Sequence, residues 1–423
     1  MKRIAFIALT AIFAMTMNSC KNNLQKKDYP KADVTGIMSK DALIQPKYAK
    51  GFTVKYQKDG VRLVDIFGSE MEMKGMGGMK KHHDKGMKKA HGEHSGKMHM
   101  MGDKEHMMDD HKSDYHFALV PRGAKVNVPA GYTPIEIPIK STICMTLLQL
   151  SNFTALDAHD YVKGITSTKN LFDKDILKRV KEGDIVKIGQ EGNFDTEVVM
   201  AANPDIIFIS PFKRGGYETI KETGITLIPH LGYKELSPLG QAEWIKFVSM
   251  FIGKEKEANK IFAGIEKRYQ AAKALALKVK NRPVVFSGEI HGGNWFAVGG
   301  KNYLAQMFRD AGAEYVLKND HHTGGVPMDF ESLYAQAAQA DYWRILNSYP
   351  GNFSYDALKA SDPRNADFKA FKEKHVIYCN MKQTPYYELS PVQPDILLKD
   401  FIAIFHPELM PKDYKPTYYT LLK

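Results

Sequence analysis

The sequence of 423 residues contains only three cysteines. Cys20 ends the N-terminal apolar stretch, which leaves Cys144 and Cys379 for the rest of the chain. So few cysteines exclude a disulfide-rich secreted scaffold. Cys144 and Cys379 fall in the two different lobes that are predicted below. We therefore expect two buried free thiols rather than a bridge, although spacing alone does not decide their redox state.

The sequence also lacks the common catalytic motifs. It has no G-x-S-x-G elbow, no G-x-x-x-x-G-K-[ST] loop, no G-x-G-x-x-G after a strand and no H-E-x-x-H. The net charge is +11, but no basic stripe is interleaved with aromatic residues, so nucleic-acid binding is not indicated. In an exported chain with two lobes, these absences favour a binding protein over an enzyme.

The N-terminus reads MKRIAFIALTAIFAMTMNSC, a basic start followed by an apolar run of signal-peptide length. Residues 17–20 resemble a lipobox, which predicts cleavage before Cys20 and a lipid on that cysteine. The alternative is an ordinary secretory signal with an incidental cysteine. No later stretch is apolar enough to cross a membrane. We therefore expect a periplasm-facing lipoprotein of the cell envelope, anchored at Cys20.

The first predicted structure is a small β-meander with strands at 52–57, 61–67 and 115–120. Lys58-Asp59-Gly60 supplies a tight turn between the first two strands. Residues 71–113 lie between the second and third strands and contain almost no apolar pattern. We expect them to form a disordered loop that leaves the sheet and returns to it.

From residue 135 onward, short apolar strands alternate with helices, which is typical of a parallel sheet covered on both faces. Strands are expected at 135–139, 161–166, 184–188, 204–210 and 225–228, with helices between them, such as 195–204. Ser237-Pro238 then opens a long helical segment with one apolar face, broken or bent at Gly253 and continuing to about residue 280. A second alternation follows, with strands at 283–290, 314–317, 342–346 and 375–379, and helices near 302–311, 330–339, after 362 and after 390.

The predicted fold class is α/β, with two Rossmann-like lobes joined by a long interlobe helix and an N-terminal β-meander extension. The expected parts are a signal peptide (1–19), the β extension (20–132) with its insert (71–113), the N-lobe (133–236), the interlobe helix (237–281) and the C-lobe (282–423).

Ligands of parallel α/β sheets meet the loops at the carboxyl ends of the strands. These loops supply the candidate ligand-binding residues Gln190, Glu191, Phe194, Lys213, Arg214, His291, Trp295, His322, Tyr386 and Tyr387. Trp295 lies in a Gly-bounded loop and would line a cleft, unless it is an ordinary core tryptophan. His321 and His322 could ligate a metal or hydrogen-bond a ligand, but surface-loop histidines are the favoured interpretation. Lys213 and Arg214 would suit an anionic ferric chelate, unless they are salt-bridge partners.

Five segments in order carry a family resemblance: EVVMAANPDIIF (197–208), SPLGQAEWI (237–245), WFAVGGKNYLAQMFRDAGAEY (295–315), MDFESLYAQAAQADYW (328–343) and QPDILLKDFIAIFHPELMP (393–411). Together they make the chain from about residue 133 resemble the cobalamin and iron-siderophore class of ABC-transporter substrate-binding proteins, class III of the periplasmic binding proteins. The resemblance implies a rigid helical linker between lobes that move little around the ligand.

The resemblance also implies the partners, namely an ABC permease with its ATPase and one small-molecule ligand, an iron chelate (siderophore or haem) or cobalamin. An acid on each lobe would contact the permease, which points to Glu218 on the N-lobe. On the C-lobe the matching place holds Arg309, with Asp310 next to it. Gln190 stands where haem-carrying relatives tend to have tyrosine, which makes haem the less favoured ligand. We expect a monomer that requires no resident cofactor.

Residues 71–113 hold seven of the chain's 15 histidines and ten of its 21 methionines. Imidazole suits Cu, Zn, Ni and Fe ions, and thioether selects Cu(I). The alternative is low-complexity solvation. The candidate metal ligands are His82, His83, His91, His94, Met98, His99, Met100, Met101, His106, Met107, Met108 and His111. A metal-gathering loop beside a ligand cleft is the favoured interpretation. An envelope copper-storage or tolerance lipoprotein is the alternative, and an enzyme with an unfamiliar site is a third.

Overall fold

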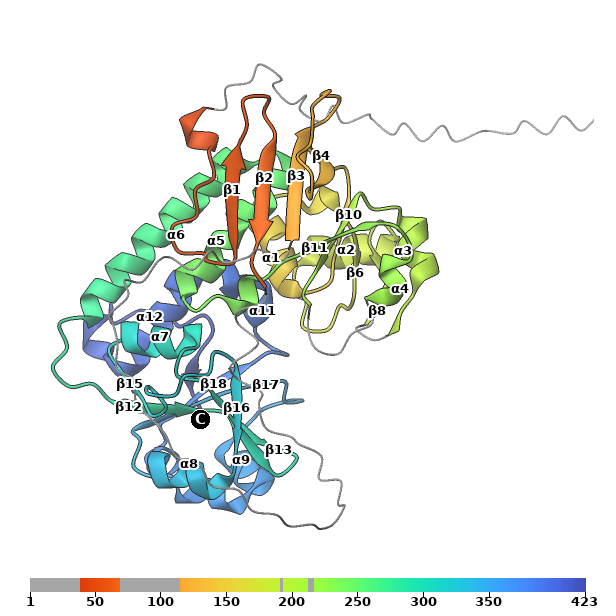
Figure 1. Ribbon diagram of the computed structural model, residues 1–423. Helices are drawn as coiled ribbons and strands as arrows, with labels where there is room; N and C mark the ends of the chain where they lie inside the picture. Colours follow the sequence, from red (N-terminus) through yellow and green to blue (C-terminus); the bar gives the residue numbers. More distant parts are fainter. Residues whose placement is uncertain (1–38, 69–114, 191–192, 212–216) are drawn as a thin grey trace, which may run out of the picture. The chain divides into compact units, whose positions relative to one another are not determined.

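The structure is a computed structural model that describes residues 39–68, 115–190, 193–211 and 217–423 (Figure 1). It confirms the predicted α/β fold class. Within the described ranges, no helix has both the length and the apolar character needed to span a membrane.

The N-terminal sheet has four strands in the order β1-β2-β3-β4. Their bounds are β1 Phe52–Tyr56, β2 Arg62–Ile66, β3 Tyr115–Pro121 and β4 Thr133–Ile137. The first three form the predicted antiparallel meander, and Gly60 has the positive φ of +82° that its turn requires. Figure 1 shows β1, β2 and β3 side by side.

The strand expected to open the N-lobe belongs instead to this N-terminal sheet. β4 pairs in parallel with β3, and its side chains alternate between exposed and buried, with Ile135 and Ile137 turned inward. Such alternation fits a sheet with one solvated face, whereas strands of a covered parallel sheet are buried on both sides.

The N-lobe sheet is parallel, in the order β11-β10-β5-β6-β7. Its first strand, β5, lies between the strands predicted at 135–139 and 161–166, where no strand is expected. The elements are β5 Thr142–Cys144, α1 Leu147–Ala155, β6 Val162–Ile165, α2 Lys174–Glu182, β7 Val186–Lys187, β8 Gly189–Gln190, β9 Asn193–Phe194, α3 Thr196–Ala202, β10 Ile206–Ile209, α4 Glu218–Lys221 and β11 Thr226–Pro229.

Two helices follow, α5 (Pro238–Ile252) and α6 (Glu255–Ala276). The Ser237 side chain accepts the Gly240 N–H as the N-cap of α5, with Pro238 at the first helical position, as predicted. Gly253 ends α5 with a left-handed φ of +70°, so the break or bend predicted at this glycine is a break between two helices.

The C-lobe sheet has the order β15-β12-β17-β18-β19, with β19 antiparallel at one edge. A smaller antiparallel sheet, β13-β14-β16, accompanies it. The elements are β12 Val284–Ser287, β13 Glu289–His291, β14 Asn294–Val298, α7 Tyr303–Asp310, β15 Glu314–Tyr315, β16 Gly325–Met328, α8 Phe330–Ala337, β17 Tyr342–Asn347, α9 Tyr355–Ser361, α10 Lys369–Lys372, β18 Val376–Asn380, α11 Tyr386–Leu389, α12 Pro394–Phe405 and β19 Thr420–Leu421.

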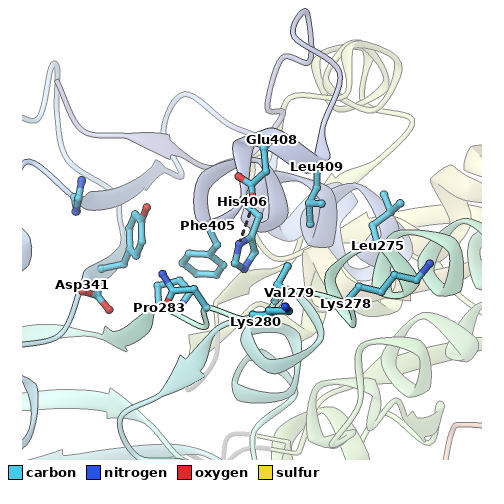
Figure 2. A pocket seen from close by; sticks show the side chains of 13 residues that line it. Leu275, Lys278, Val279, Lys280, Pro283, Asp341, Phe405, His406, Glu408 and Leu409 are labelled. Atoms are coloured by element: carbon cyan, nitrogen blue, oxygen red, sulfur yellow. Dashed lines mark ion pairs between the residues drawn. The ribbon is translucent and has the colours of Figure 1, made fainter.

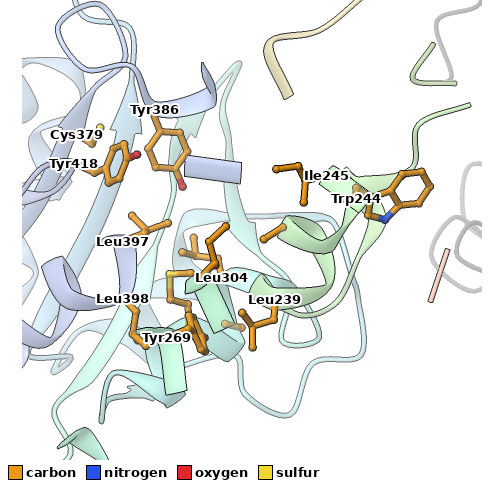
Figure 3. Close-up of a cluster of buried hydrophobic side chains, with 14 of the residues drawn as sticks. Leu239, Trp244, Ile245, Tyr269, Leu304, Cys379, Tyr386, Leu397, Leu398 and Tyr418 are labelled. Carbon is orange, nitrogen blue, oxygen red and sulfur yellow. The ribbon is translucent and has the colours of Figure 1, made fainter. Parts of the chain in front are cut away.

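The linker helices share one hydrophobic core with the C-lobe. Figure 3 shows Leu239 of α5, Tyr269 of α6, Leu304 of α7 and Leu398 of α12 gathered together, and all four are at most 3% exposed. Cys144 and Cys379 are buried free thiols, as predicted.

The segment before β1 is held by two buried carboxylates. Glu243 Oε2 on α5 accepts the backbone N–H groups of Lys47, Tyr48 and Ala49 at 2.6–2.9 Å. Glu235 accepts those of Lys50 and Gly51, together with the Trp244 indole N–H. The N-terminal sheet is therefore tied to the interlobe helix by charge-assisted hydrogen bonds.

Candidate functional site

Two adjoining hollows lie at the carboxyl ends of β5 and β6 in the N-lobe. Their volumes are about 710 and 280 Å³, and both are lined by Thr166, Ser167 and Gln190. The larger also includes Lys187 and Phe194. This is the sheet edge at which parallel α/β folds bind ligands.

The hairpin β8–β9 forms one wall of the larger hollow and places Gln190 and Phe194 there. Gly189 has a φ of +86°, and a Cβ at this position would lie 2.5 Å from the carbonyl oxygen of Asn193. Only glycine fits this tight pairing. Phe194 stacks on Tyr217, whose hydroxyl donates to the carbonyl oxygen of Ser210 at 2.7 Å. The aromatic wall is thus fixed to the end of β10.

The first turn of α1 lines the smaller hollow through Thr146 and Leu147. Thr146 and Gln149 form a capping box at this helix start. Gln149 also donates to the Ser210 hydroxyl at 3.0 Å, and Thr166 donates to the carbonyl oxygen of Met145 at 3.0 Å. These bonds hold the loops after β5, β6 and β10 in fixed positions.

The C-lobe approaches this region through α11, which contacts α1. Glu388 of α11 accepts the backbone N–H of Phe172 at 2.6 Å. Burial raises the pKa of Glu388, and the hydrogen bond from Phe172 opposes that rise. The neighbouring Tyr387 is 45% exposed, so it can offer an aromatic face to a ligand.

A buried arginine and several tyrosines lie behind Tyr387. Arg344 of β17 donates through Nε to the Tyr419 hydroxyl at 2.7 Å and lies over the Tyr419 ring. Burial raises the pKa of Tyr386 well above its usual value, so this tyrosine stays neutral. Tyr386 is 2% exposed and packs against Tyr418 and Tyr419, so its predicted role as a ligand-lining residue is wrong.

The prediction that Trp295 lines a cleft is also wrong. Trp295 has no exposed surface, donates its indole N–H to the carbonyl oxygen of Ser287 and packs against Phe286 and Trp343. Side chains alternate along β14, so the adjacent Phe296 is the one that points outward, at 43% exposure.

Asp310 is 5% exposed and cannot serve as a docking residue at the surface. It accepts the Tyr269 hydroxyl at 2.8 Å and pairs with Lys273 at 2.9 Å, which ties α7 to α6. Glu218 is exposed as the first residue of α4.

The structure places the other predicted ligand residues apart from the N-lobe hollows. His291 is exposed at the end of β13, near the Phe296 ring, and His322 pairs with Asp320 at 2.8 Å. Glu191, Lys213, Arg214, Cys20 and the His and Met residues of 71–113 lie outside the described residues.

Sequence reasoning missed Thr146, Thr166, Ser167 and Lys187. Thr166 ends the strand predicted at 161–166, and residues 167–168 directly follow it. Because ligands bind at the carboxyl ends of parallel strands, this position could have identified Thr166 and Ser167.

A separate hollow of about 600 Å³ lies at the opposite, amino-terminal edge of the C-lobe sheet (Figure 2). Pro283, Asp341 and His375 line it where β12, β17 and β18 begin. His406 and Glu408 face one another at 3.7 Å on its wall. Because ligands of parallel α/β sheets bind at the carboxyl ends of the strands, we do not assign the ligand to this amino-terminal edge.

The family model described as periplasmic binding protein matches residues 143–382, more than half of the chain. The chain belongs to the periplasmic binding protein family. The resemblance seen in the sequence motifs is thereby confirmed for the family.

The chain is also similar to relatives in sequence and to solved structures in fold. An uncharacterized lipoprotein of Methanocaldococcus jannaschii is 28% identical over 305 residues, 68% of this chain and 70% of the relative. A periplasmic heme binding protein from Pseudomonas aeruginosa superposes with a TM-score of 0.54 at 17% identity, covering 66% of this chain and 97% of that chain. An ABC-type Fe3+-hydroxamate transport protein from Saccharomonospora viridis gives a TM-score of 0.50 at 16% identity, covering 64% and 94%. At such identities the structural likeness shows the fold of this periplasmic binding protein.

Proposed function

We propose that this periplasmic binding protein is a lipid-anchored carrier that delivers an iron chelate or cobalamin to an ABC importer, and not an enzyme. The observation that carries the proposal is the pair of N-lobe hollows, faced by a C-lobe helix that contacts α1. Two lobes meeting at such an edge can enclose a small molecule. Cys20 would carry the anchor, Glu218 would contact the permease, and the protein would act as a monomer. The domain bounds would be those given above, except that β4 at 133–137 belongs to the N-terminal sheet.

The lining of the hollows favours an anionic ferric siderophore among these ligands. Lys169 and Lys187 supply positive charge, Thr166 and Ser167 supply hydroxyl groups, and Phe194 supplies an aromatic wall. The described residues that line the two hollows include no histidine, tyrosine or methionine, so the hollows themselves offer haem iron none of these ligands. One structural neighbour is described as a heme-binding protein and another as part of a hydroxamate transport system. Binding experiments should therefore include both classes of chelate.

Replacing Phe194 or Tyr387 by alanine should weaken binding of the preferred chelate. Loss of one aromatic wall should cost about 1–3 kcal/mol, which is roughly five- to 150-fold in Kd. The panel is a ferric hydroxamate, a ferric catecholate, haem and cyanocobalamin, titrated by quenching of intrinsic fluorescence. The matched control is Leu275→Ala. Leu275 is a 46% exposed apolar residue that lines the hollow at the amino-terminal edge of the C-lobe sheet. Equal affinities in all three variants would contradict the proposal, as would a panel in which nothing binds.

The His/Met-rich segment 71–113 would gather Cu, Zn or Fe ions as an accessory to transport. Its seven histidines and ten methionines offer imidazole and thioether ligands without fixed spacing. The alternative, a metal-storage or copper-tolerance lipoprotein, would need the α/β part only as a scaffold.

Replacing residues 71–113 by a short Gly/Ser turn should sharply lower metal stoichiometry while chelate affinity stays the same. The reason is that these residues contain most of the chain's methionine and histidine ligands outside the lobes. The measurement is titration of both proteins with Cu(I), Zn(II) and the panel chelates. Equal metal stoichiometry would reject the metal-gathering role, and metal binding without chelate binding in the intact protein would favour storage.

A further inference from the structure

The outer edge of the C-lobe sheet carries positive charge that the proposed ligand site does not use. Two adjoining hollows of about 270 and 620 Å³ lie there and share Gly300, Arg309 and Lys318. Glu314 and Tyr315 of the edge strand β15 line the smaller one. These hollows are called the C-lobe edge site below.

Both carboxylates of this site are already engaged. Glu314 pairs with Lys318 at 2.6 Å, and this ammonium group holds the pKa of the Glu314 carboxyl below its usual value. Asp320 accepts the Gly300 N–H and faces the His322 ring at 2.8 Å.

The other cations of the site make no such close pair, although Arg282 also helps to lower the pKa of the Glu314 carboxyl. Across the described parts of the chain, Arg282, Lys301 and Arg309 form no ion pair with a carboxylate. Lys301 and Arg309 are exposed and Arg282 is half-buried, so an incoming anion can reach them.

The backbone holds these side chains on a fixed frame. Arg282 Nη2 donates to the carbonyl oxygen of Arg309 at 2.7 Å, which places its guanidinium group at the end of α7. The Lys301 N–H donates to the carbonyl oxygen of His322 at 3.0 Å. A Cβ at Gly300 would collide with the carbonyl oxygens of Leu317 and Asp320, so the two loops are in direct contact.

We propose that the C-lobe edge site binds a phosphate group, either as free phosphate or as an anionic phospholipid headgroup. Guanidinium groups match phosphate oxygens through paired N–H donors, and lysine ammonium groups add point charges. Leu236, 39% exposed, adds an apolar wall to the larger hollow.

The test compares two charge-reversal variants of equal net charge, both in a Cys20→Ser background so that no lipid anchor contributes. One carries Lys301→Glu and Arg309→Glu. The control carries Lys359→Glu and Lys372→Glu, two exposed C-lobe lysines outside the hollows. The probes are inorganic phosphate, measured by calorimetry at low salt, and vesicles of phosphatidylcholine with or without phosphatidylglycerol, measured by co-sedimentation.

We expect the edge-site variant to lose at least about tenfold in affinity for the phosphate-bearing probe, and the control to lose less than about twofold. Phosphate binding identifies a free-phosphate site, and binding only to vesicles containing phosphatidylglycerol identifies a headgroup site. Equal losses in both variants, or binding of a glutamate peptide without either phosphate probe, would overturn the proposal. If the edge-site variant melts early, Lys301→Gln with Arg309→Gln replaces it. The chelate panel, run on the same variants, reports on the proposed transport function separately.

Discussion

Replacing Ser167 by tryptophan should nearly abolish chelate binding. Ser167 lines both N-lobe hollows, so an indole at this position would occupy space that the ligand requires. We expect affinity to fall by at least about 100-fold, which corresponds to roughly 2.7 kcal/mol. Because Ser167 is exposed and its hydroxyl accepts the N–H of the nearby Lys169, the melting temperature should change little.

The matched control for this variant is Asn281→Trp. Asn281 is also exposed and lines the hollow at the amino-terminal edge of the C-lobe sheet. The Asn281→Trp variant adds the same indole ring to this C-lobe hollow and should leave chelate affinity unchanged. If Asn281→Trp blocks binding and Ser167→Trp does not, the ligand occupies the hollow at the amino-terminal edge of the C-lobe sheet instead.

Glu243→Gln should produce the largest loss of stability. Glu243 is fully buried, its Oε2 accepts three backbone N–H groups and its Oε1 accepts the Lys246 ammonium group at 2.7 Å. The side-chain NH₂ group of glutamine would face either the three backbone N–H groups or the Lys246 ammonium group, so donors would face donors. In either orientation the buried Lys246 would lose its negatively charged partner. Breaking a buried charged pair in this way costs about 3–5 kcal/mol.

Glu266→Gln is the control, since Glu266 accepts bonds from the side chains of Lys47 and Tyr48 at a half-buried position. Its exposed ion pair should contribute less than about 1 kcal/mol. Urea unfolding followed by far-UV circular dichroism measures both variants. Equal losses would contradict the view that the Glu243 carboxylate ties the N-terminal sheet to α5.

The sequence predicts the fold well where local pattern decides it. Ser237-Pro238 marks the start of α5, and Asp59-Gly60 marks the first hairpin. It fails at β4 because the choice of sheet depends on pairing with β3, a contact between segments that no local periodicity contains. Short β5 is missed for a similar reason, since three residues carry too little pattern to distinguish a strand from a loop.

The residues of the candidate site are likewise predicted correctly where local pattern decides their position, and incorrectly where contacts between distant segments decide it. Gln190 and Phe194 are found because they follow a predicted strand at the ligand-binding edge. Trp295 is misplaced because only the register of β14 against β16 decides which of Trp295 and Phe296 faces the core. Asp310 is misplaced because its partner Lys273 lies on another helix, so the sequence gives no sign of the ion pair that buries it.

Hydrogen–deuterium exchange of the protein with and without the panel chelate that binds best tests the central claim most directly. The claim is that the ligand lies between the N-lobe hollows and α11. We predict slower exchange at 166–169, 187–190 and 386–389, with little change at 278–283 and 405–409. Protection confined to 278–283 and 405–409, with none at the N-lobe hollows, would contradict it.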